Sequence, residues 1–152
     1  FHEFLGQSSR LDEIQASVLL AKLPCLKKWN RRRKEIAGLY SARLRVIENL
    51  LTPQITKGRD HIFHQYTIRF AQRDALADKL ARHNVPTAIH YPLPLHLQPV
   101  FQFLHYQAGD FPEAEAASRQ VLSLPIYPEL DKKSIDRIIK KVILLANEIN
   151  GG

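Results

Sequence analysis

The sequence predicts an α/β domain in which three short strands form a small sheet that is covered by helices. Three observations support this fold class. Apolar residues recur with the helical period over several segments, the period changes to two over residues 62–70, and helical and strand-like segments alternate without an internal repeat. The 152 residues are enough for one domain with a substantial core but too few for two domains of ordinary size.

Two helices are expected at the N-terminal end. Ser9 suits the N-cap of the first, because Glu13 then lies in the first turn, where the helix dipole favours negative charge. Pro24 lacks an N–H group and clashes with the preceding turn, so we predict a break near Leu23. The apolar face of the first helix comprises Leu11, Ile14, Val18 and Ala21. The second run ends before Thr52, and its apolar stripe comprises Leu26, Trp29, Ile36, Tyr40, Leu44 and Ile47.

A first strand is predicted over residues 62–70, where residues at alternate positions share a face. The more apolar of the two faces holds Ile62, His64, Tyr66, Ile68 and Phe70. A histidine on such a face is more often a hydrogen-bonded core residue than a ligand, and we predict the former for His64.

A short helix over residues 71–83 follows, with Leu76 and Leu80 on its apolar face. Asn84 then occupies a position that suits a left-handed C-cap residue. The next strand is predicted over residues 85–89, and a helical turn that carries Phe101 over residues 95–103.

Pro112 suits the first position of a helix that continues over residues 113–120. A third strand, over residues 121–124, ends at Pro125. The last helix, over residues 134–149, has the clearest helical period, with Gly151 as its stop signal.

Residues 87–99 start like a strand and cannot continue as one, because Pro92 and Pro94 lack an N–H group and make the preceding residues extended. A stiff, extended segment would hold His90, Tyr91 and His96 at fixed positions. The alternative is an ordinary loop whose prolines reduce the entropy of the unfolded chain.

The formal net charge is +7, and much of the excess lies in Lys27, Lys28 and residues 31–34. Helical spacing distributes these cations around the helix, which favours a solvated helix face. We expect no nucleic-acid partner, because the aromatic pattern and the paired zinc ligands of such proteins are missing from the sequence. Attraction to a smaller anion stays open.

Metal binding is not expected, since no two histidines have the helical spacing that holds zinc. Cys25 is the one cysteine; it suits a reducing compartment, and we expect a cytoplasmic protein without a membrane segment. The sequence starts at Phe1 and contains no methionine, so we interpret it as a fragment.

Five further motifs follow GQSSRLDEIQA at residues 6–16. They are the KWNRRRKEIAGLY segment at 28–40, HIFHQY at 61–66, IHYPLPLH at 89–96, GDFP at 109–112 and LSLPIYP at 122–128. The first resembles the G-x-N-x-R-x-D-E-x-Q-A signature of the DegT/DnrJ/EryC1/StrS aminotransferases, and the others follow in the order of that family. The chain is therefore identified as a member of this family.

This resemblance implies a fold type I, pyridoxal 5'-phosphate-dependent transferase. Residues 1–52 would be a helical segment that links to and packs on a cofactor domain, and residues 53–152 a small C-terminal α/β domain. The family transfers an amino group, with glutamate the expected donor, to nucleotide-linked keto sugars, as in cell-surface polysaccharide biosynthesis. It does so as a homodimer.

The resemblance also implies site residues. Ser8 stands where the family has an asparagine that binds the cofactor phosphate of the partner protomer. Arg10, His90, Tyr91 and His96 would contact the substrate. No catalytic residue is expected in this chain, because the family's Schiff-base lysine precedes Gly6.

Ser8 and Pro24 depart from the family's pattern, which has asparagine at the first position and a continuous helix at the second. Because the Schiff-base lysine is missing, the chain alone should lack transaminase activity. The alternative is a non-catalytic, residual binding or dimerisation domain from a truncated gene.

Overall fold

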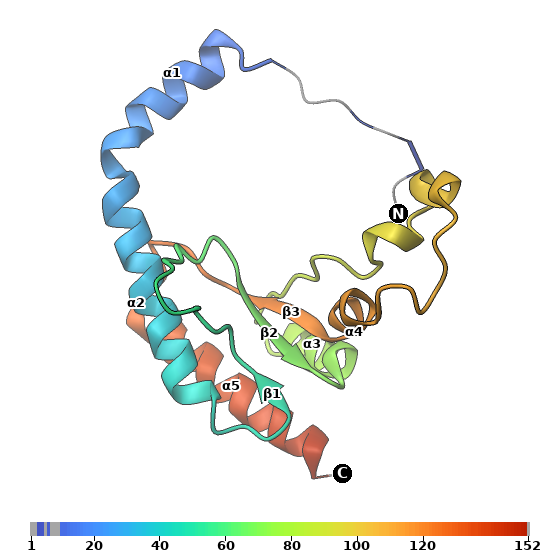
Figure 1. The fold of residues 1–152 in the computed structure, drawn as a ribbon. Coiled ribbons are helices and arrows are strands. Elements are labelled where there is room, and N and C mark those ends of the chain that lie inside the picture. The colour runs from blue at the N-terminus through green and yellow to red at the C-terminus, as the bar shows by residue number, and fades with distance from the viewer. Residues whose placement is uncertain (1–2, 5, 7–9, 152) are drawn as a thin grey trace.

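A computed structural model describes residues 3–4, 6 and 10–151 of the chain (Figure 1). It has the predicted α/β class, with a three-stranded sheet and helices around it. The elements in chain order are α1 (Glu13–Lys22), η1 (Leu23–Cys25), α2 (Leu26–Leu44), β1 (Leu50–Leu51), β2 (Tyr66–Phe70), α3 (Arg73–Arg82), η2 (Leu95–Leu97), η3 (Pro99–Leu104), α4 (Pro112–Gln120), β3 (Val121–Leu124) and α5 (Lys132–Asn150), where η marks a 3-10 helix.

The sheet has the order β1-β2-β3 and is antiparallel throughout. Leu50 pairs with Phe70 at one edge of β2, and Tyr66 pairs with Leu124 at the other. The two-residue strand β1 was not predicted. It adds the segment that follows α2 to one edge of the sheet, so β2 is the central strand.

The predicted strand over residues 85–89 is wrong as a strand. Ala88 alone pairs with the sheet, by exchanging two backbone hydrogen bonds with Ser123 at 3.1 and 2.8 Å. Pro86 and Pro92 flank this bridge and have no N–H group to donate, so the ladder does not extend. The bridge nevertheless fixes the start of the proline-rich segment against β3.

The strand predicted from residue 62 begins only at Tyr66. Phe63 has a left-handed φ of 52°, which a strand cannot contain, and its N–H donates to Nδ1 of His61 at 2.9 Å. This turn buries the Phe63 ring and leaves His64 exposed. The prediction of a core position for His64 is therefore wrong.

The core lies between the sheet and the helices α2, α3 and α5. Helix α5 contacts both α2 and α3, as Figure 1 shows for α2. The helical period predicted this packing: α5 buries Ile135, Ile138, Ile139, Val142, Leu145 and Ala146. The predicted stripe of α2 is buried from Ile36 onward, whereas Leu26 at its start is exposed.

Helix α1 extends away from the sheet (Figure 1), and none of its residues is buried. Its N-cap is Asp12, whose carboxylate accepts from the Gln15 N–H at 2.7 Å. The predicted cap, Ser9, lies outside the described residues. The break predicted at Pro24 is confirmed as the 3-10 turn η1.

Several predicted helix ends are confirmed. Asn84 follows α3 with a left-handed φ of 56°, and Pro112 is the first residue of α4. Helix α5 starts two residues earlier than predicted, because Asp131 caps it by accepting from the Ser134 N–H at 2.7 Å. Within the described residues, no helix is both long and apolar enough to cross a membrane.

Candidate functional site

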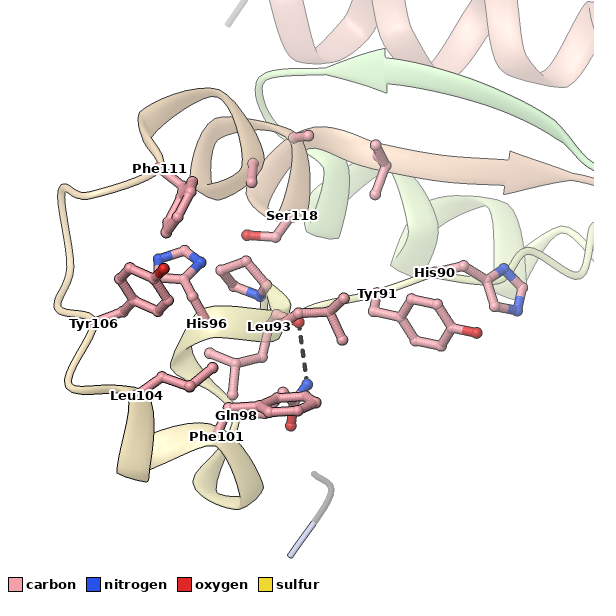
Figure 2. Close-up of a pocket in the computed structure, with 15 residues that line it drawn as sticks. His90, Tyr91, Leu93, His96, Gln98, Phe101, Leu104, Tyr106, Phe111 and Ser118 are labelled. Atoms are coloured by element: carbon pink, nitrogen blue, oxygen red, sulfur yellow. Dashed lines mark hydrogen bonds between the residues drawn. The ribbon is translucent and has the colours of Figure 1, made fainter. Parts of the chain in front are cut away.

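The proline-rich segment forms one side of a pocket of about 760 Å³ (Figure 2). The other sides come from η3, from the loop before α4, from α4 itself and from the first residue of β3. Most of the lining is apolar, and its large apolar side chains are Leu93, Leu95, Phe101, Leu104, Phe111 and Val121.

Three predicted site residues line this pocket: His90, Tyr91 and His96. Figure 2 shows His90 and Tyr91 at one end and His96 at the other. Arg10 lies outside the lining, exposed and close to the start of α1, and Ser8 lies outside the described residues. The roles of all five residues stay predictions.

His90 is held by Gln65, which directly precedes β2. The Gln65 side-chain nitrogen lies 3.2 Å from Nδ1 of His90. When this amide donates to Nδ1, the neutral imidazole carries its proton on Nε2 and offers it as a donor. The Tyr91 ring meets the imidazole edge-on, with the ring centres 5.6 Å apart.

His96 is buried against α4. Its Nε2 lies 3.1 Å from Oε1 of Glu115, and both side chains are about nine-tenths buried. The same oxygen accepts from the backbone N–H of Gly109 at 2.8 Å. This N–H, and after it the hydrogen bond from His96, holds the pKa of Glu115 below its ordinary value.

Gln98 completes the turn of the segment. Its side chain is buried, and Nε2 donates to the Leu93 carbonyl at 3.1 Å (Figure 2). This bond joins a residue before η2 to a residue after it, so the backbone that carries His96 is fixed from both sides.

Gln65 and Glu115 were not predicted from the sequence as site residues. Gln65 belongs to the HIFHQY motif that was singled out, but its partner lies 25 residues away. Glu115 lies in the first turn of the predicted helix after GDFP, and its partner His96 is 19 residues away. A buried polar pair of this kind leaves no periodic signal in the sequence.

The fold and the sequence of this chain match those of known proteins. The chain superposes on the crystal structure of DesV from S. venezuelae with a TM-score of 0.87 and 38% identity, over 96% of this chain and 39% of that one. It is 44% identical over 144 residues to a "Pleiotropic regulatory protein" of Geobacillus stearothermophilus, covering 93% of this chain and 39% of the relative. It is 39% identical over 141 residues to a dTDP-3-amino-3,4,6-trideoxy-alpha-D-glucose transaminase of Streptomyces venezuelae, covering 93% of this chain and 37% of the relative.

The fold is thus that of an aminotransferase. The model of the DegT/DnrJ/EryC1/StrS aminotransferase family matches residues 1–143, and the chain belongs to this family. The resemblance seen in the motifs is confirmed. Pyridoxal phosphate is the cofactor that this membership indicates. The chain spans less than two fifths of the length of the relatives named above: 39% of the Geobacillus protein and 37% of the Streptomyces transaminase.

The pocket itself does not fit this cofactor. Among the described residues that line it, none is a lysine or an arginine that could pair with the cofactor phosphate or bond its carbonyl carbon. The described residues also include no group of three histidine, cysteine, aspartate or glutamate side chains that could hold a metal ion. The histidines, the two tyrosines and the apolar side chains suit an uncharged, hydroxyl-bearing part of a ligand instead.

Proposed function

We propose that this chain is the C-terminal part of a pyridoxal-phosphate-dependent aminotransferase that acts on a nucleotide-linked keto sugar. Glutamate gives its amino group to the ring carbon that bears the oxo group, and 2-oxoglutarate leaves. Membership of the family over nearly the whole chain, with His90, Tyr91 and His96 on one pocket, carries this proposal. A transaminase of a dTDP-linked amino sugar at 39% identity supports the sugar class.

When it is bound, the cofactor would supply an electron-withdrawing ring to the reaction. A lysine outside this chain would hold it. This chain contributes groups that bind and orient the sugar. His90 offers its Nε2 proton to a sugar oxygen, and Tyr91 packs against the sugar ring. Arg10, exposed and before α1, has a planar fork that matches phosphate oxygens.

The exposed apolar residues of α1 support the proposed packing of this helix on a cofactor domain. Ile14, Leu19 and Leu20, and Leu11 just before the helix, are all more than half exposed in this chain. A helix of this kind is stable when another surface covers it. We propose that residues 1–52 link to the cofactor domain and pack on it through α1, and that Ser8 and Arg10 reach the site of the second protomer of a homodimer.

The experiment uses the full-length protein that contains this chain. The protein is loaded with pyridoxal phosphate and given dTDP-3-amino-3,4,6-trideoxy-α-D-glucose and 2-oxoglutarate, the reverse direction of the proposed reaction. Release of glutamate is the expected result. H90Q should lower kcat/KM about tenfold, because the flexible glutamine amide does not hold a donor at the position of Nε2 and the hydrogen bond to the substrate is weakened.

H83Q is the matched control, because His83 is also exposed and lies outside the pocket. Its kcat/KM should equal that of the parent protein. Glutamate release that is equal in H90Q and H83Q would remove His90 from the site. A folded, cofactor-loaded protein that forms no glutamate from any dTDP- or UDP-linked 3-amino sugar would favour the alternative of a non-catalytic binding or dimerisation domain.

A further inference from the structure

Glu115 is a buried carboxylate that the proposed reaction does not use. It lies behind the pocket and not in its lining. A carboxylate that is nine-tenths buried is costly unless donors satisfy it. Here Oε1 alone accepts from two donors, the Gly109 N–H at 2.8 Å and Nε2 of His96 at 3.1 Å. One oxygen therefore connects η2, the loop before α4 and α4.

We infer that Glu115 is a positioning residue for the aromatic wall of the pocket, which we define as the rings of His96, Tyr106 and Phe111. Through His96 and Gly109 it fixes both the first ring and the loop that carries the other two. The identification of the pocket as a substrate pocket rests on the proposed function, whereas the connection itself does not.

The wall is a series of ring contacts that starts at the Glu115 partner. The ring centres of His96 and Phe111 are 4.8 Å apart, and those of Phe111 and Tyr106 are 5.0 Å apart. Figure 2 shows the three rings together at the end of the pocket opposite His90. Displacement of His96 would therefore shift the whole wall.

Packing alone does not hold this wall. Phe111 is 42% exposed and Tyr106 is 47% exposed, so each ring has one free side. His105, directly before Tyr106, has a left-handed φ of 59°, which a residue other than glycine rarely adopts, and Gly109 between the two rings has a φ of 100°, which glycine permits. The hydrogen bond from Gly109 to Glu115 holds the loop in this shape, because it joins residue 109 to a helix that is anchored on the sheet.

The test compares three variants of the full-length protein by hydrogen exchange and mass spectrometry. E115A removes both acceptor bonds. E115Q keeps them, because a glutamine carbonyl in the place of Oε1 still accepts from both donors. E113A is the matched control, since Glu113 has the same charge in the same helical turn and is exposed.

We expect E115A to accelerate exchange in peptides that cover residues 105–111 by about tenfold or more, the effect of a lost bond to a charged acceptor. Exchange elsewhere, and exchange in E115Q and E113A, should stay at the level of the parent protein. In the glutamate-release assay with the dTDP-linked amino sugar, E115A should raise KM severalfold and leave kcat within twofold.

Three results would overturn the inference. They are a local exchange rate in E115A equal to that in E113A, an acceleration spread evenly over the chain, and an E115Q variant that behaves like E115A. A merely structural role would lower the active fraction, and with it kcat, without changing KM. If no sugar is aminated by the parent protein, the proposed function fails, and the exchange experiment still decides the role of Glu115.

Discussion

Arg73 should be one of the most costly residues of this chain to remove. It is the first residue of α3, and its side chain is only 6% exposed. Nη1 donates to the Ser118 carbonyl at 3.1 Å and to the Val121 carbonyl at 2.9 Å. These carbonyls lie at the C-terminal end of α4, where the helix dipole favours a cation. Arg73 thereby fixes the junction of α4 and β3 that supplies one side of the pocket.

The magnitude follows from these contacts. R73A removes two hydrogen bonds from a charged donor, each contributing about 1.5–3 kcal/mol, so the free energy of unfolding should fall by roughly 3–6 kcal/mol. The ion pair with Asp74 adds little, because that carboxylate is 79% exposed. R73K keeps the charge but lacks the planar guanidinium group. Its free energy of unfolding should therefore fall by about half as much as that of R73A.

The assay is urea denaturation followed by far-UV circular dichroism, with R82A as the control. Arg82 lies in the last turn of the same helix and is exposed, so its removal should change the free energy of unfolding by less than about 0.5 kcal/mol. A loss below about 1 kcal/mol in R73A, or a loss equal to that in R82A, would refute the argument.

Three further predictions concern the core and the pocket. Burial, with smaller contributions from Tyr127 and Tyr66, raises the pKa of Tyr40, whose hydroxyl donates to the Pro125 carbonyl at 2.8 Å. The native state therefore favours the neutral phenol, and the stability that this gives, complete below pH 10.0, should decline as the pH rises above that value. In urea titrations at pH 9–11, Y40F should show a smaller decline than the parent protein, and Tyr66, whose pKa burial also raises, supplies the rest. L80A should cost about 2–5 kcal/mol in the same assay at neutral pH, because Leu80 is fully buried and leaves a cavity, and a cost below 1 kcal/mol would contradict this. Q65L should raise KM for the dTDP-linked sugar with little change in the free energy of unfolding, since Gln65 is exposed and serves to orient His90; an unchanged KM would argue against that role.

The parts of the fold that periodicity can describe were predicted from the sequence. Helix α5 and the buried face of β2 follow from repeated apolar spacing over at least five residues. Strand β1 has two residues and is too short to show any period. The turn at Phe63 was missed for another reason. The alternating apolar residues around it are typical of a strand, and the sequence has no signal for the left-handed φ of an aromatic residue.

Part of the pocket lining was predicted from the sequence for a different reason, closeness along the chain. His90, Tyr91 and His96 belong to one short segment whose prolines fix its shape, so sequence proximity was enough to bring them to one pocket. Gln65 and Glu115 reach these residues only after the chain has folded. Their roles depend on tertiary contacts, which neither composition nor spacing encodes.

The charges of the pocket limit which part of a nucleotide sugar it can take under the proposed function. Its described lining has no lysine or arginine, and Glu115 places a negative charge behind the wall. A diphosphate in this pocket would lose its hydration without gaining a cation. The sugar ring fits the pocket better, and the diphosphate then needs cations outside the lining. Arg10 is the predicted candidate, so R10K should weaken binding of dTDP itself, whereas H90Q should affect the sugar conjugate and leave dTDP binding unchanged.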